Sequence, residues 1–141
     1  MLFTNEIAHI VHGKVDLYGG AANKNIGDAF LLVFKFAEAD IIKDGSSVEI
    51  NAKSKHVQEV ADLSLISFVK IDIKINRAPK MTKYRSHERL CERMKNYSVK
   101  MGYGLHVGWA IEGAIGSEYK IDASYLSPNV NMASRLEAAT K

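Results

Sequence analysis

One long apolar stripe with helical spacing constrains the fold of this chain most strongly. Apolar and small residues recur every three or four positions from Val57 to Ile75, which predicts an amphipathic helix that ends before Pro79. A helix of this length has to bury its apolar face against another layer of structure. The positions that form the stripe are Val57, Val60, Ala61, Ser64, Leu65, Phe68, Ile71 and Ile75.

The N-terminal part of the sequence predicts a helix followed by a β-hairpin. Gly19-Gly20 ends the helix, and Gly27-Asp28 supplies a two-residue turn with glycine first, which suits a type II′ hairpin. The predicted strands are residues 23–26 and 29–36. Residues 38–55 are polar and contain Gly45-Ser46-Ser47, which indicates a loop or an insertion. The apolar positions of the first helix are Phe3, Ile7, Ile10, Val11 and Val15.

The C-terminal part predicts a second hairpin and a last helix. Alternation over Lys100–Ala110 predicts a strand, which pairs through a short turn near Glu112 with a second strand at about residues 113–121. Ser127 is predicted to cap the last helix, with Pro128 in its first position, and the helix runs to about Ala139. The order of helix, hairpin, helix, hairpin and helix is typical of an α+β domain in which helices cover one side of an antiparallel sheet.

Length and composition favour one domain, residues 1–141, in a reducing compartment. The single cysteine excludes an intramolecular disulfide. No apolar run approaches the roughly 18 residues of a membrane helix, and no signal peptide is visible. We therefore expect a cytoplasmic domain, either free or as the cytosolic part of a larger, membrane-associated protein.

The net charge of +3 is unevenly distributed. Between Lys80 and Lys100 there are seven basic residues against Glu88 and Glu92, so this segment is +5 and the rest of the chain is −2. A basic stretch can contact phosphate, but we favour a solvated helix face, with a short helix predicted at about residues 88–96, because only Tyr84 and Tyr97 are available for stacking. We expect no nucleic-acid partner, although a nucleic-acid-binding domain of ferredoxin-like fold is an alternative that this segment leaves open.

Three polar residues are candidates for a site. Asp28 lies on a tight turn, where a carboxylate can bind Mg²⁺ together with substrate phosphates, or can be a plain turn aspartate. Asn131 and Arg135 are spaced i,i+4, so an amide and a guanidinium project from one helix face, which can bind ribose and phosphate or can be solvated. The glycines form no dinucleotide or P-loop motif, and the histidines have no zinc-site spacing.

Three strings resemble the catalytic domain of class III nucleotide cyclases, closest to the soluble-type adenylate cyclases. They are NKNIGDAFLLVF (23–34), GLHVGWAIEGAIGS (104–117) and SPNVNMASRLE (127–137), in the order in which that family carries them. The resemblance covers about residues 3–36 and 56–141, with an unmatched insertion between. It implies a ferredoxin-like α/β sandwich that works as a homodimer or pseudo-heterodimer with a second cyclase domain.

The resemblance also implies an activity and roles for particular residues. The reaction is conversion of ATP to 3′,5′-cyclic AMP and pyrophosphate with two divalent metals, Mg²⁺ or Mn²⁺, for intracellular signalling. By matching positions, Asp28 binds metal, Asn131 orients the ribose and Arg135 stabilises charge on the phosphates. Lys24 and Ser124 match the positions that select the base, and a lysine donor suits adenine N1. A guanylate cyclase is the alternative substrate assignment.

The sequence also departs from the family pattern at both ends. The family's first strand, with its other metal-binding aspartate, and its C-terminal strands, with a triphosphate-binding lysine, have no counterpart here. We therefore expect the isolated chain to have little activity. A non-catalytic cyclase-homology module that regulates a partner cyclase domain is the second hypothesis.

Overall fold

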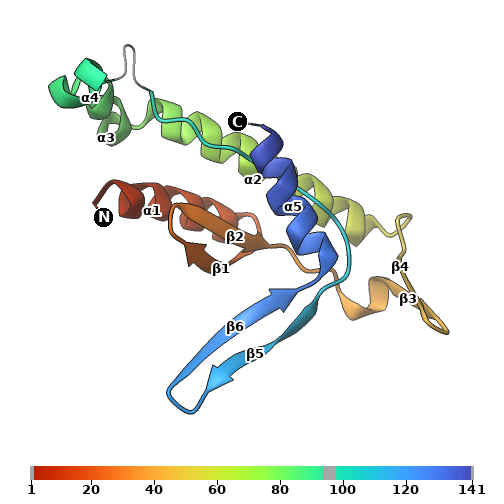
Figure 1. Cartoon of the computed structure of the whole chain (residues 1–141). Coiled ribbons are helices and arrows are strands. Elements are labelled where there is room, and N and C mark those ends of the chain that lie inside the picture. The colour runs from red at the N-terminus through yellow and green to blue at the C-terminus, as the bar shows by residue number, and fades with distance from the viewer. Residues whose placement is uncertain (1, 94–97, 141) are drawn as a thin grey trace.

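The computed structural model describes residues 2–93 and 98–140, and its elements confirm the predicted α+β class (Figure 1). The helices are α1 (Leu2–Leu17), α2 (Lys55–Arg77), α3 (Pro79–Thr82), α4 (Glu88–Arg93) and α5 (Pro128–Ala139). The strands are β1 (Ala21–Ile26), β2 (Ala29–Val33), β3 (Ile41–Asp44), β4 (Ser47–Ile50), β5 (Ile111–Ser117) and β6 (Lys120–Leu126). Short 3₁₀ turns cover Glu38–Asp40 and Lys83–Ser86.

The strands form three antiparallel hairpins, β1–β2, β3–β4 and β5–β6. In the part of the chain that the structure describes, no backbone ladder joins one hairpin to another. The predicted turn at Gly27-Asp28 joins β1 to β2, and Gly27 has φ +63°, which glycine adopts without strain. Each hairpin therefore pairs strands that are neighbours in the sequence, and the positions of the hairpins relative to one another depend on side-chain packing.

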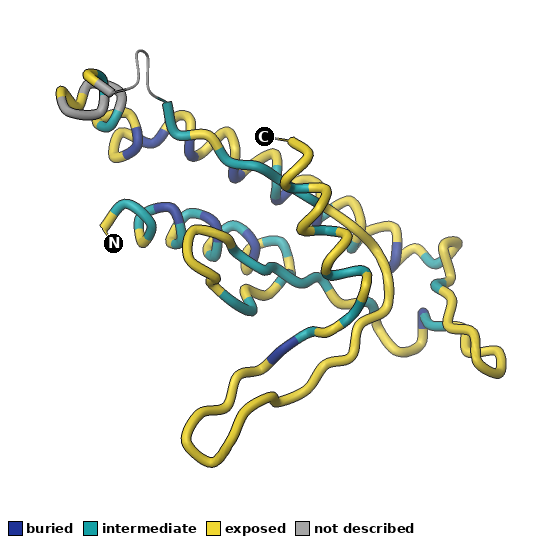
Figure 2. The backbone as a smooth tube through the Cα atoms, viewed as in Figure 1, coloured by how far each residue is buried: buried dark blue, intermediate teal, exposed yellow. Residues whose placement is uncertain are grey.

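The hydrophobic core lies between α1 and α2. Val11 and Val15 of α1 and Ile71 of α2 are each 0–1% exposed, which confirms the centre of both predicted apolar stripes. Within the α2 stripe, the predictions for Ala61 and Leu65 are wrong, because both are exposed, and Ser67 is buried in their place. Figure 2 shows that the buried positions of these two helices concentrate along their facing sides. Other buried members of this core are Ile7, Ile75, Ala78 and Met81, with Phe30, Leu32 and Phe34 of the first hairpin region packed against it.

Residues 38–55, predicted to be a loop or an insertion, contain the β3–β4 hairpin. The backbone turns at Gly45 between β-branched residues, which favour strands although the segment is polar overall. The buried carboxylate of Asp40 accepts hydrogen bonds from Ser54 Oγ at 2.5 Å and pairs with His56 Nδ1 at 2.6 Å. The hydrogen bond from Ser54, followed by that from His56, lowers the pKa of Asp40. This network fixes the hairpin to the first turn of α2.

The prediction of a strand at Lys100–Ala110 is wrong. These residues form no ladder, and the predicted turn near Glu112 is also wrong, because Glu112 lies inside β5. The C-terminal hairpin is β5–β6, which pairs Ser117 with Lys120 across its turn, so the strand predicted at about residues 113–121 spans that turn. The backbone of the segment bonds to α5 side chains: Tyr103 N donates to Thr140 Oγ1 at 3.3 Å, and Trp109 O accepts from Asn129 Nδ2 at 2.9 Å. At these two positions the backbone groups are satisfied by side chains of α5 and of its C-cap, Thr140, and not by a neighbouring strand.

Glycine allows this segment to lie directly against α5. A Cβ added at Gly104 would overlap the carbonyl oxygen of Ala133 and lie 2.6 Å from the backbone nitrogen of Glu137. Figure 1 shows the segment running along α2 and beside α5. Tyr103 packs near Phe68 of α2, with ring centroids 5.7 Å apart, and burial raises the pKa of its hydroxyl to about 12. The extended segment thus packs between two helices.

The remaining predicted boundaries are largely confirmed. Ser127 Oγ accepts hydrogen bonds from the backbone nitrogens of Asn129 and Val130, both at 3.1 Å, with Pro128 in the first turn of α5. Helix α2 ends before Pro79, as predicted. Of the helix predicted at residues 88–96, α4 covers Glu88–Arg93, and residues 94–97 lie outside the described part.

Within the basic segment, Lys83 forms an ion pair with Glu6 of α1 at 3.3 Å and lies over the ring of Tyr84. Lys83 therefore has an intramolecular partner. Among the described helices, none combines the length and the apolar character that crossing a membrane requires.

The α1–α2 core yields a test of the fold. Replacing Ile71, which is 1% exposed, by alanine should lower the free energy of unfolding by about 2–5 kcal/mol, because it removes buried methyl groups and leaves a cavity. Ile73→Ala on the same helix is the matched control, because Ile73 is 40% exposed. Urea denaturation measures both, and equal losses for the two variants would contradict the assigned core.

Candidate functional site

The structure brings together Lys24 and Ser124, two predicted substrate-binding residues that are 100 positions apart. Lys24 Nζ on β1 donates a hydrogen bond to Ser124 Oγ on β6 at 2.5 Å. Ser124 is 5% exposed and is the one buried residue of the β5–β6 hairpin, all of which is described. Figure 2 shows this buried point within a hairpin that is exposed along most of its length. The contact therefore places a cation beside a hydroxyl where β1 and β6 meet.

A β-bulge in β1 explains how the neighbouring side chains of Asn23 and Lys24 both reach β6. The register of β1 against β2 shifts between Ala22 and Lys24, so Asn23 is the extra residue. Asn23 Nδ2 donates to the carbonyl oxygen of Ala123 at 3.4 Å, next to the Lys24–Ser124 contact. The Oδ1 atom of Asn23 is buried, and no partner for it lies among the described residues. Sequence reasoning missed Asn23, because nothing local marks the bulge.

Asp28 lies on the exposed turn between β1 and β2. No cluster of three or more His, Cys, Asp or Glu side chains that could hold a metal occurs within residues 2–93 and 98–140. A single exposed carboxylate nevertheless fits a divalent ion that takes its other oxygen ligands from water and substrate phosphates, as Mg²⁺ commonly does. Asp28 is thus suited to supply one ligand.

Asn131 and Arg135 lie one turn apart on α5, and both are exposed. The helix row that contacts the glycine-rich segment consists of Asn129, Ala133 and Glu137. Positions 131 and 135 are each two residues from position 133, about 200° around the helix, so they project on the opposite side. The same packing that fixes α5 therefore leaves the predicted ribose and phosphate ligands open to solvent.

The five predicted site residues do not all meet. Within the described residues, the hydrogen bonds and ion pairs join Lys24 to Ser124 and do not join this pair to Asp28, Asn131 or Arg135. The first hairpin carries Lys24 and Asp28, and α5 follows β6 directly. The predicted residues therefore form three groups: the bonded pair of Lys24 and Ser124, the turn carboxylate of Asp28, and Asn131 with Arg135 on α5.

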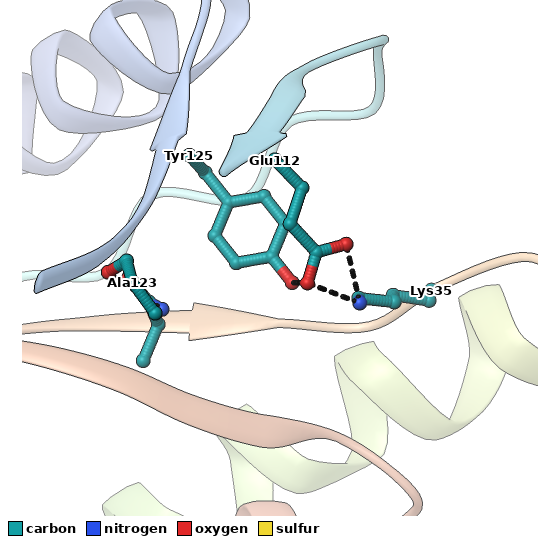
Figure 3. A network of polar contacts seen from close by, with 5 residues as sticks. Lys35, Glu112, Ala123 and Tyr125 are labelled. Carbon is teal, nitrogen blue, oxygen red and sulfur yellow. Dashed lines mark hydrogen bonds and ion pairs between the residues drawn. The ribbon is translucent and has the colours of Figure 1, made fainter. Parts of the chain in front are cut away.

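A second polar network, which sequence reasoning missed, joins the β5–β6 hairpin to Lys35, two residues after the end of β2 (Figure 3). Lys35 Nζ lies 2.7 and 2.6 Å from the two carboxylate oxygens of Glu112, and Tyr125 OH donates to Glu112 Oε1 at 2.8 Å. The hydrogen bonds from Lys35 and then Tyr125 lower the pKa of Glu112. The hydrogen bond to Glu112, followed by that with Tyr125, raises the pKa of Lys35. Both groups are therefore charged at neutral pH.

This network borders a cavity of about 820 Å³. Its walls come from the end of β2, the β3–β4 hairpin, α2, residues 105–110 and the start of α5. Leu105, Val107 and Trp109 line it and are substantially exposed, and Lys35 lies at its edge. None of the five predicted site residues lines this cavity, so it is not by itself the predicted nucleotide site.

Comparison with known proteins identifies the family of this chain. Residues 4–141 match the family described as the adenylate and guanylate cyclase catalytic domain. Catalytic domains of that family act on nucleotide substrates, use divalent metal ions and generally form dimers. No match was found among curated proteins.

Two solved structures of a bacterial light-regulated adenylyl cyclase share the fold. They align with TM-scores of 0.63 and 0.62, each with 24% sequence identity over 99% of this chain. The aligned region is 32% of the length of each of those proteins, so this chain spans about a third of them. At this identity the likeness concerns the fold.

Proposed function

This chain belongs to the family of adenylate and guanylate cyclase catalytic domains, and we propose that it converts ATP to 3′,5′-cyclic AMP and pyrophosphate for intracellular signalling. The observation that carries the proposal is the contact between Lys24 and Ser124, which unites the two positions expected to select the base. The bacterial proteins of similar fold are titled adenylyl cyclases, which agrees with this choice of substrate.

The chemistry of the pair favours adenine over guanine. The Lys24 ammonium has three donors, of which one reaches Ser124 Oγ, so others remain for a ligand. The Ser124 hydroxyl accepts from Lys24 and keeps a second acceptor lone pair and its own proton. Adenine presents an acceptor at N1 beside a 6-amino donor, whereas guanine presents an N1–H donor that a lysine opposes. ATP therefore suits this pair better than GTP.

The other predicted residues would act on the ribose and the phosphates. Asn131 would orient the ribose so that its 3′-hydroxyl faces the α-phosphorus, and Arg135 would stabilise negative charge on the phosphates during release of pyrophosphate. Asp28 would hold a divalent ion, Mg²⁺ or Mn²⁺, which supplies electrostatic stabilisation of the triphosphate. A second cyclase domain, as a homodimer or a pseudo-heterodimer, would complete the site.

The proposed roles of Asp28 in metal binding and of Asn131 in orienting the ribose can be tested by measuring cyclic AMP formation. Asp28→Ala and Asn131→Ala should each lower the rate of cyclic AMP formation, in the presence of Mg²⁺ or Mn²⁺, by about 100-fold, because each removes stabilisation of the reacting phosphates or ribose. Asp44→Ala, an exposed carboxylate at the β3–β4 turn, and Ser134→Ala on α5 are the matched controls. Mass spectrometry of the product measures the low rate expected. Unchanged rates in both test variants would refute the assigned roles.

Base selection is tested separately at Lys24. Lys24→Glu replaces a donor by an acceptor, so the affinity for ATP should fall while the affinity for GTP rises, and the ratio of the two should shift by about tenfold. Titration of fluorescent ATP and GTP analogues into the chain measures both affinities. Lys14→Glu on α1 controls for the change of two charge units. An ATP-to-GTP ratio that stays constant in Lys24→Glu would show that this residue does not read the base.

A further inference from the structure

The relative position of the β1–β2 and β5–β6 hairpins depends on side chains. The two hairpins share no backbone ladder, although β1 and β6 lie in contact. Two sets of polar contacts connect them in the described structure. One is Lys24 and Asn23 with residues 123–124 of β6, and the other is Lys35 with Glu112 of β5.

The two sets are coupled through adjacent residues of β6. Ser124 and Tyr125 are neighbours on a strand, so their side chains leave opposite faces of the hairpin. Ser124 reaches Lys24 of β1, while Tyr125 is the direct cross-strand partner of Glu112 and bonds to its carboxylate. Figure 3 shows Glu112 and Tyr125, from neighbouring strands, converging on Lys35 where the chain leaves β2. The orientation of β6 at Ser124 is therefore tied to the Lys35–Glu112 pair.

The exposure of this network argues against a role in holding the fold together. The side chains of Lys35 and Glu112 are 57% and 56% exposed, and exposed ion pairs contribute little to the free energy of unfolding. The network instead restricts the relative orientation of its three side chains. Lys35 bonds both carboxylate oxygens of Glu112, and Tyr125 bonds one of them. Lys35 Nζ also lies 5.5 Å from the centroid of the Tyr125 ring. Three mutually bonded groups restrict orientation more than a single ion pair does.

We propose that Lys35, Glu112 and Tyr125 are positioning residues for base selection, which hold β6 so that Ser124 stays within hydrogen-bond distance of Lys24. This inference rests on the proposed function for its link to ATP, but its structural part concerns only the two hairpins. Loss of the contacts among Lys35, Glu112 and Tyr125 lets the hairpins move apart, so that Ser124 and Lys24 no longer contact the same base. Recognition of ATP then weakens more than recognition of GTP, and the preference between them narrows.

The test compares two isosteric changes in the same hairpin. Glu112→Gln removes the charge that Lys35 binds, whereas Asp122→Asn makes the same chemical change in the Lys120–Asp122 pair, an exposed contact of 3.4 Å. The double variant with Lys35→Glu and Glu112→Lys exchanges the two charges, so an ion pair can form again at the same place. Affinities for fluorescent ATP and GTP analogues, the nuclear Overhauser effect between the Lys24 and Ser124 side chains, and the thermal midpoint are measured for each.

For Glu112→Gln we expect a loss of the Lys24–Ser124 Overhauser effect and about two- to tenfold weaker ATP binding, with an unchanged thermal midpoint. Asp122→Asn should resemble the original chain, and the exchange should recover part of the ATP preference. An Overhauser effect or an ATP-to-GTP ratio that survives Glu112→Gln overturns the proposal. If the unaltered chain shows no preference for ATP, the proposed function fails, and the Overhauser effect alone decides whether the network positions Ser124.

Discussion

The packing of α1 on α2 is the interaction on which the rest of this structure depends. Val11, Val15 and Ile71 are almost completely removed from water, and burying apolar surface is the largest favourable contribution to folding. The hairpin β1–β2 rests on this pair through Phe30 and Leu32. Because β1 follows α1 closely, the helix pair sets where Lys24 and Asp28 lie.

The β5–β6 hairpin and α5 are attached to the rest of the protein by contacts that are more polar. Glycines let residues 102–108 lie against α5, whose first turn is capped by Ser127, and this leaves Asn131 and Arg135 facing away from the protein. The β5–β6 hairpin extends away from the helices (Figure 1) and meets β1 through Lys24 and Ser124. A rigid apolar pair thus carries one half of the candidate site, and a polar attachment positions the other half.

The parts of the fold with local signals could be predicted from the sequence. Periodicity identified α1 and α2, and turn and capping residues identified the β1–β2 turn and the start of α5. Alternation over Lys100–Ala110 gave a wrong prediction, because an extended segment becomes a strand only beside a partner strand, and here the segment lies against α5 and bonds to Asn129 and Thr140. The Lys35–Glu112 pair spans 77 positions and joins exposed charges, so no local pattern indicates it. Lys24 and Ser124 could be paired only through the family resemblance.

Lys24 and Ser124 are proposed to act together on one nucleotide base. A double-mutant cycle on ATP affinity, with Lys24→Ala, Ser124→Ala and the double variant, measures this most directly. Since the two side chains are in contact, the account predicts that their effects are not additive, with a coupling free energy of about 1 kcal/mol. Effects that add to within about 0.3 kcal/mol would mean that the two residues act independently, and this would contradict the account.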